Sequence, residues 1–105
     1  MNHYMKLENA KAYIKDRLSQ EELLAQLAEE ASELAHAALK LRRALDGTNP
    51  TPVDFPTASS AIREEVADVT LLVQLLGLDS DPGELRAMMD HKTLRWQSRL
   101  IESEA

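Results

Sequence analysis

The stretch QLAEEASELAHAALK, residues 26–40, decides the fold and places an acid among its core-facing leucines. Leucines within and around it recur every three or four residues, as on one side of a helix: Leu23, Leu27, Leu34, Leu41 and Leu45. Glu30 stands on that same side, between Leu27 and Leu34. Because burial of an unpaired charge is costly, a carboxylate at this position needs a compensating partner.

Length and composition indicate one small helical domain, which we assign to residues 1–105. Three glycines and four prolines, beside abundant alanine, leucine, glutamate and arginine, favour helices. The absence of cysteine excludes disulfides and thiolate metal sites. The net charge of -6 argues against binding of a nucleic-acid polymer, which requires a basic surface.

The same composition gives expectations for location and assembly. No apolar run approaches the roughly 20 residues of a membrane span, and the first residues, MNHYMKLENAK, lack the apolar core of a signal peptide. We therefore expect a cytoplasmic protein without membrane contact. A chain this small buries only part of its surface, so association into a homodimer or homotetramer would add stability.

Periodicity and capping residues predict four helices, at about residues 4–18, 20–45, 59–76 and 82–102. Ser19 and Glu22 have the spacing of a capping box, and Gly47 suits the left-handed residue after a helix. Asp81 is the predicted cap of the last helix. The proline-rich residues 48–58 predict an ordered or semi-rigid loop.

The third predicted helix carries acids in its inward stripe too, which follows a 4-3-4-3 spacing: Ala61, Glu65, Asp68, Leu72 and Leu75. Its end, VTLLVQLLGL (residues 69–78), is apolar almost all round, which is typical of a central helix or a subunit interface. In the fourth helix, Leu85, Met89 and Trp96 mark the predicted inner side. Four such helices predict an all-α bundle that oligomerises through its helices.

Two helices therefore each direct an acid pair toward the core. Carboxylates that lie close together and lose water repel each other, and a divalent cation compensates for this best. A set of oxygen ligands without cysteine favours Mg²⁺, for which Mn²⁺ can substitute. The predicted ligands are Glu30, Glu33, Glu65 and Asp68. For any single acid, a solvated surface position is the simpler interpretation, so the prediction depends on the two pairs together.

A di-iron bundle is a weaker alternative. Glu33 and His36 form a Glu-x-x-His element, of which di-iron bundles need two. Neither His3 nor His91 follows an acid by three residues, so the second element is missing.

The two acidic motifs also resemble a known family. EEASE (residues 29–33) followed by EVAD (residues 65–68) is similar to the EExxE…ExxD signature of MazG-like nucleoside triphosphate pyrophosphohydrolases, which belong to the all-α NTP pyrophosphatase superfamily. The likeness covers about residues 20–100. It includes HKTLRWQSRL (residues 91–100), which resembles the Lys/Arg-rich last helix of short members.

The resemblance implies a four-helix MazG-like bundle and Mg²⁺-dependent hydrolysis of an NTP or dNTP to the monophosphate and pyrophosphate, as in cleaning of the nucleotide pool. It implies that a metal on the two acid pairs bridges the triphosphate, with Glu29 as candidate general base or outer-shell ligand. Lys92 and Arg95 are candidate phosphate contacts, and Lys40 is a candidate lining residue of the substrate pocket. A solvated surface position is the alternative for each of these three.

Two features depart from the family pattern. The gap between Glu33 and Glu65 is longer, because it contains the proline-rich loop. Few aromatic rings are available to stack on a base, and Trp96 is more simply a core residue. The alternative function is a non-catalytic helical interaction module that retains a structural metal site.

Overall fold

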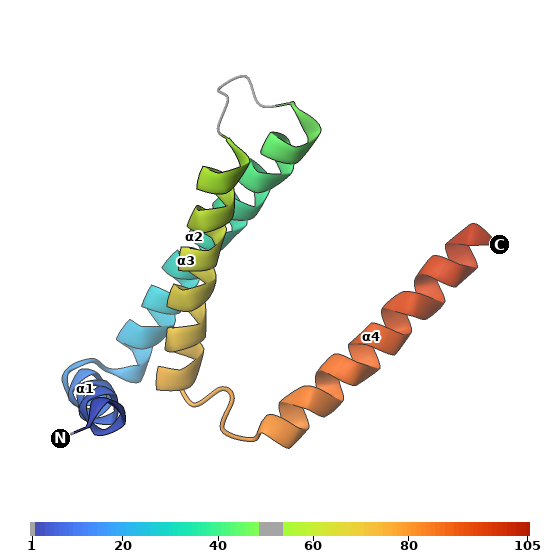
Figure 1. Cartoon of the computed structure of the whole chain (residues 1–105). Helices are drawn as coiled ribbons and strands as arrows, with labels where there is room; N and C mark the ends of the chain where they lie inside the picture. Colours follow the sequence, from blue (N-terminus) through green and yellow to red (C-terminus); the bar gives the residue numbers. More distant parts are fainter. Residues whose placement is uncertain (1, 49–53) are drawn as a thin grey trace.

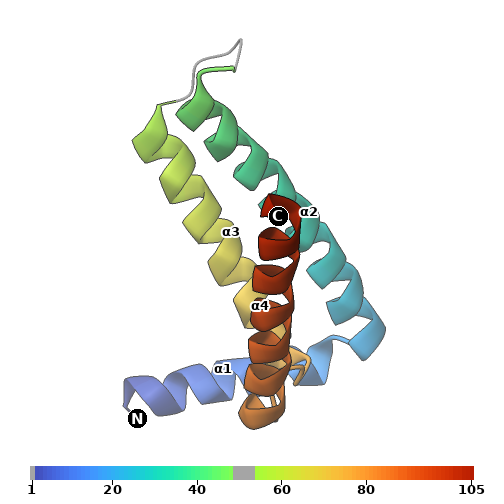
Figure 2. The same cartoon turned by 90° about the vertical axis from the view of Figure 1, so that its right-hand side faces the viewer.

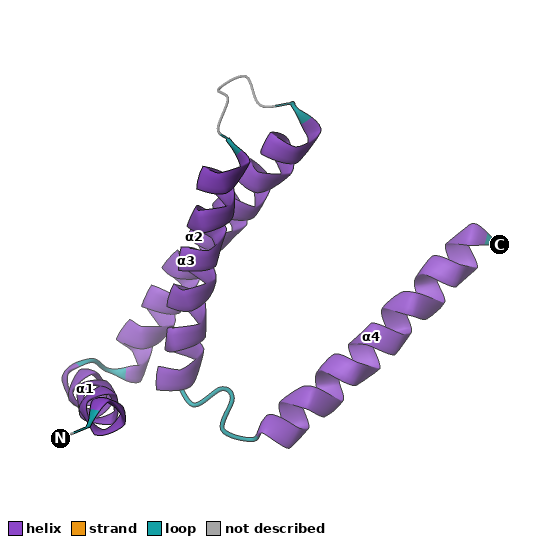
Figure 3. Cartoon of the chain, viewed as in Figure 1, coloured by secondary structure: helices purple, strands orange, loops and turns teal. Residues whose placement is uncertain are grey.

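The computed structural model describes residues 2–48 and 54–105, and the regular structure of this part is entirely helical (Figures 1 and 3). Its helices are α1 (His3–Arg17), α2 (Gln20–Asp46), α3 (Phe55–Leu75) and α4 (Pro82–Glu104). The predicted all-α class and the four helices are confirmed. No helix in the described part combines the length and apolar character that crossing a membrane requires.

The start of α3 differs from the prediction by four residues. Residues 55–58 of the expected loop are helical, and residues 49–53 of it lie outside the described part. Asp54 caps the helix, since its side chain accepts a hydrogen bond from the Thr57 backbone N–H at 2.8 Å. Pro56 lies in the first turn, where its missing N–H removes no helical hydrogen bond.

The predicted caps of α2 are confirmed. Glu22 N donates to Ser19 Oγ at 3.0 Å, and Ser19 N donates to the Glu22 carboxylate at 3.2 Å, which completes the capping box. At the other end, Gly47 has φ 72° and its N–H donates to the Arg43 carbonyl at 2.9 Å. Only glycine adopts this left-handed conformation without a steric cost, so α2 ends there.

Helices α2 and α3 form an antiparallel hairpin and are the pair that packs along its length within the described part (Figure 1). The buried side chains lie at heptad-like positions on both helices, which is the pattern of helices packed at a shallow angle. Those of α2 are Leu23 and Ala37, and those of α3 are Ala58, Leu72 and Leu75. Glu30 and Glu65 lie in the same two rows, each half-buried.

Two details of the predicted stripes are wrong. Leu45 is 67% exposed, because it lies at the open end of α2. On α3, Ala61 and Asp68 are exposed, whereas their neighbours Ile62 and Val69 are half-buried. Both sets have helical spacing, and the larger apolar side chains of the second set gain more from burial. The packed row therefore keeps Glu65 but passes beside Asp68.

Helix α1 crosses the end of the hairpin (Figure 2). Ile14 packs against the core formed by Leu23, Leu72 and Leu75, and Lys11 Nζ donates to Gln74 Oε1 at 3.4 Å. Through these contacts α1 closes the core at the hairpin's lower end.

Helix α4 leaves the hairpin at an angle and is exposed along its whole length (Figures 1 and 2). The predicted inner side of α4 is therefore wrong for the single chain: Leu85 is 40% exposed, Met89 59% and Trp96 69%. The reason is the turn between α3 and α4, where Gly77 has φ 70° and the chain changes direction. A bundle of four helices thus needs more than the contacts of one chain.

Burial predicts which leucines matter for stability. Leu72→Ala should lower the free energy of unfolding by about 2–5 kcal/mol, because it leaves a cavity between α2 and α3. Leu45→Ala, at an exposed position, should change it by no more than about 0.5 kcal/mol. Urea denaturation followed by circular dichroism measures both values, and equal losses in the two variants would contradict the described core.

Candidate metal centre

Three of the four predicted metal ligands converge on one point of the hairpin. One carboxylate oxygen each from Glu30, Glu65 and Asp68 lies within 4.8 Å of the other two. Glu30 comes from the middle of α2, and the other two come from adjacent turns of α3. Because Glu30 and Glu65 lie in the packed rows, the helix contact itself brings their carboxylates together.

Glu65 is the least solvated member of this acidic cluster (Glu30, Glu65 and Asp68). Its Oε2 atom is buried and accepts no hydrogen bond from the described residues. Burial raises the pKa of Glu65 above its usual 4.5, and the neighbouring Glu30 carboxyl raises it further. Asp68 and Glu33 act in the same direction through their charges. A buried oxygen without a partner, among like charges, is a position where a cation would be stabilised.

A neighbouring amide orients Glu30. Gln26 Nε2 donates to Glu30 Oε1 at 3.0 Å, one turn along α2. Gln26 is not among the predicted site residues, although its spacing of four residues from Glu30 favours this contact. The hydrogen bond holds one oxygen of the Glu30 carboxylate in place.

The other two predicted acids, Glu33 and Glu29, are not members of the acidic cluster. Glu33 is exposed and outside the group of oxygens within 4.8 Å, although its charge reaches Glu65. Glu29 is exposed on α2. Glu29 precedes Glu30 by one residue, and Glu33 follows it by three.

The predicted basic residues are not gathered at the cluster. Lys40 is exposed on α2, and Lys92 and Arg95 are exposed on α4, which projects away from the hairpin. His36 is exposed as well, and the metal-compatible cluster found in the described part of the chain contains no histidine. The geometry therefore lends no support to a di-iron centre.

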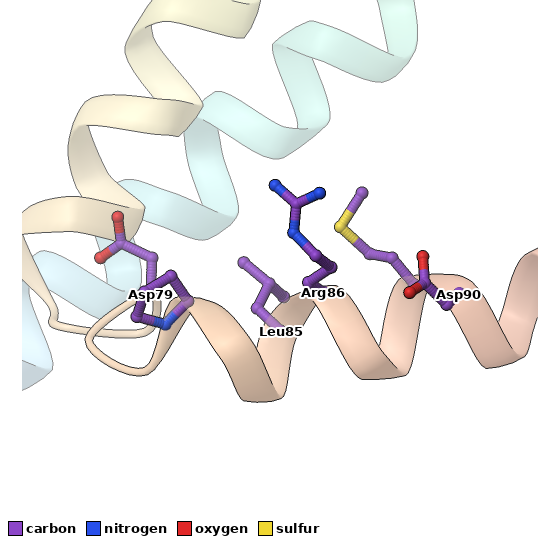
Figure 4. Close-up of a pocket in the computed structure, with 6 residues that line it drawn as sticks. Asp79, Leu85, Arg86 and Asp90 are labelled. Carbon is purple, nitrogen blue, oxygen red and sulfur yellow. The ribbon is translucent and has the colours of Figure 1, made fainter.

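Surface hollows lie at several places on the described part of the chain. One, of about 460 Å³, lies against the first turns of α3 and is lined by Pro56, Thr57, Ser60, Ala61 and Glu64. Ala61 and Glu64 precede Asp68 by seven and four residues, so the hollow is on the same side of α3 as that carboxylate. Another, of about 370 Å³, lies at the root of α4 and is lined by Asp79, Pro82, Leu85, Arg86, Met89 and Asp90 (Figure 4).

The donor set fits a hard divalent cation. It consists of carboxylate oxygens only, with two half-buried members and one exposed member that leaves access from solvent. Mg²⁺ prefers such oxygen ligands and keeps several waters, so three carboxylates on one side of the ion suit it. The same geometry suits Mn²⁺.

Comparison with protein-family models, with curated proteins and with solved structures finds no match to this chain.

The raised pKa of Glu65 predicts an unusual response to pH in metal-free protein. Folding disfavours ionisation of this group, so its contribution to stability falls as pH rises above the unfolded value near 4.5. In EDTA at neutral pH, Glu65→Gln should therefore be more stable than the natural chain. The difference should vanish well below pH 4.5, where the carboxyl is protonated in both states.

Urea denaturation of the two proteins across this pH range measures the effect. Glu64→Gln is the matched control, because Glu64 is the exposed neighbour of Glu65 on the same helix. This variant should show little gain in stability at neutral pH. A Glu65→Gln variant less stable than the natural chain at neutral pH without metal would contradict the assignment of an electrostatic penalty to Glu65.

Metal binding should reverse this order. Mg²⁺ at about 100 times its Kd should stabilise the natural chain by about 2.7 kcal/mol, because it binds the folded state alone. Glu65→Gln should gain much less, and NaCl of equal ionic strength serves as the control for screening. Equal gains from Mg²⁺ and NaCl in a thermal melt would mean that the acids are merely solvated.

Proposed function

We propose that this chain is a Mg²⁺-dependent nucleoside triphosphate pyrophosphohydrolase, which converts an NTP or dNTP to the monophosphate and pyrophosphate and serves to clean the nucleotide pool. The observation that carries the proposal is the convergence of Glu30, Glu65 and Asp68 around a buried carboxylate oxygen that accepts no hydrogen bond from the described residues. The resemblance of the two acidic motifs to the MazG-like signature supports the choice of reaction.

In the proposed site, Glu30, Glu65 and Asp68 hold the metal, with Glu33 beside them. The bound ion supplies positive charge that offsets the triphosphate and polarises its phosphoryl oxygens. A chain of net charge -6 needs this help to bind a polyanion. Gln26 keeps Glu30 oriented through the hydrogen bond described above.

The proposed reaction is an in-line attack of water at the α-phosphorus. A bond forms between the water oxygen and the α-phosphorus while the bond to the oxygen that bridges to the β-phosphorus breaks, and pyrophosphate leaves. Glu29 is the proposed acceptor of the water proton, since it is exposed and adjacent to Glu30. Lys40, two turns from Glu33 on α2, is a proposed lining residue.

The hollow against the first turns of α3 is the proposed place for the rest of the nucleotide. Its volume of about 460 Å³ is within the usual range of small-molecule sites, roughly 300–1,000 Å³. It adjoins the N-terminal end of α3, and the helix dipole favours negative charge there. Lys92 and Arg95 remain proposed phosphate contacts. They can take this role only in an arrangement in which α4 lies close to the acidic cluster.

Release of pyrophosphate from a panel of NTPs and dNTPs with Mg²⁺ tests the proposal. Glu30→Gln and Glu65→Gln should each lower the rate by roughly 100-fold or more, the upper scale for loss of groups that position a metal. Glu21→Gln, an exposed acid on the first turn of α2, is the control and should keep its activity. Circular dichroism verifies that all variants stay helical.

The second candidate function is a non-catalytic interaction module that retains a structural cation. The exposed apolar residues of α4 favour it, because they offer a surface for association. Both functions predict stabilisation by Mg²⁺, whereas only the enzyme releases pyrophosphate. Full activity in Glu65→Gln would refute the proposed site, and silence across the whole panel would favour the module.

A further inference from the structure

The hollow against the first turns of α3 lies in line with the acidic cluster. Its lining side chains come from consecutive turns at the start of α3: Pro56, Thr57, Ser60, Ala61 and Glu64. From Ala61, steps of three and four residues lead through Glu64 to Asp68, so one row on the helix joins the hollow to the cluster. Along the helix axis, Glu64 is about 6 Å from Asp68 and Pro56 is about 18 Å from it, at 1.5 Å per residue.

The charged group in the lining of this hollow is the carboxylate of Glu64. The other lining residues are neutral, and the lining contains neither a cation nor an aromatic ring. Glu64 is exposed and forms no hydrogen bond or ion pair with another described residue. A carboxylate can only accept hydrogen bonds, so Glu64 is available to a ligand group that donates them.

The covalent order of a nucleotide matches the order of groups along this row. In a nucleotide the sugar is joined to the α-phosphate, and the base is joined to the sugar. With the α-phosphate at the metal, the sugar comes next to the cluster and the base lies farther along α3. Glu64 is the lining residue nearest to Asp68 in sequence, and Pro56 is the most distant. The sugar therefore meets the carboxylate, and the base meets neutral side chains.

The chemistry of the lining also selects the sugar. Phosphate groups are held by cations and by N–H donors, whereas a carboxylate repels them. A base is commonly held by stacking on an aromatic ring, which the lining lacks. Sugar hydroxyls donate hydrogen bonds, and an acidic side chain binds the ribose 2′-hydroxyl in this way in dinucleotide-binding folds.

We propose that Glu64 accepts hydrogen bonds from the 2′- and 3′-hydroxyls of the bound nucleotide, so that the site prefers ribonucleoside triphosphates to their 2′-deoxy forms. This assignment rests on the proposed function, which places the α-phosphate at the acidic cluster. It gives Glu64 a role in specificity, whereas its neighbour Glu65 holds the metal. A 2′-deoxy substrate offers the carboxylate one donor fewer, and that loss is the origin of the preference.

Substrates that differ by one hydroxyl test the role of Glu64. The kcat/KM for ATP should exceed that for 2′-deoxy-ATP by about tenfold or more, as expected for a hydrogen bond to a charged group. In Glu64→Ala the two values should be nearly equal. The lost charge affects both nucleotides alike, so their ratio isolates the hydroxyl. Glu21→Ala, at an exposed acid of α2, is the control and should keep the natural ratio.

Two results of this assay would overturn the assignment. One is the same ratio of ATP to 2′-deoxy-ATP in the natural chain and in Glu64→Ala. The other is a Glu64→Ala variant that changes the ratio of ATP to ITP instead, because these two differ at the base and share the same sugar. The carboxylate would then contact the amino group of the base.

Binding of non-hydrolysable analogues separates this inference from the proposed reaction. With Mg²⁺ present, calorimetry should give α,β-methylene-ATP a Kd about tenfold lower than that of its 2′-deoxy form, and Glu64→Ala should remove the difference. That result without pyrophosphate release would refute the reaction and support the sugar contact. Pyrophosphate release without any preference for the ribose form would refute the sugar contact alone, and absence of both binding and release would refute both.

A substitution that fills the hollow tests where the nucleoside lies. Ala61→Leu adds bulk to the lining, so it should raise the KM for ATP and for 2′-deoxy-ATP alike, by roughly tenfold. Because Ala61 is exposed, helical content should not change. Ala67→Leu is the matched control, since Ala67 is exposed on the same helix and does not line the hollow. An equal KM in the natural chain and in Ala61→Leu, or an equal rise in both variants, would overturn the proposed place of the sugar.

Discussion

The contact between α2 and α3 is the interaction on which the rest of the structure depends. It buries the leucine and alanine rows that form the core, and α1 adds Ile14 to its lower end. The same contact forces Glu30 and Glu65 toward each other, because both lie in the packed rows. Stability and the acidic cluster are therefore coupled, since any change that separates the helices also disperses the carboxylates.

This coupling explains why the metal-free hairpin carries an electrostatic penalty at its centre. The pKa of Glu65 is raised by burial and by neighbouring carboxylates, which means that folding works against its ionisation. A leucine at this position would pack better. A carboxylate there is advantageous only if a ligand uses it, which is the physical basis of the proposed metal centre and of the reaction built on it.

A second feature that the single chain leaves without packing partners is the apolar surface of α4. Its apolar side chains are exposed in the single chain, and the turn at Gly77 separates them from their own hairpin.

Features that depend on neighbouring residues could be predicted from the sequence. The capping residues Ser19, Glu22, Gly47 and Asp81 mark helix ends because their hydrogen bonds involve neighbours in the chain. The place of Glu30 and Glu65 among apolar residues was likewise apparent from periodicity. The early start of α3 was missed, since the prolines around its cap were assigned to a loop.

Only the tertiary structure decided which of two adjacent rows on α3 is packed. Ile62 and Val69 are half-buried, whereas Asp68 is exposed at the rim. The tertiary structure also showed that α4 does not pack on its own hairpin. Periodicity identifies an apolar side of a helix but carries no information about the element that covers it. That depends on the direction of one turn and on surfaces distant in the chain.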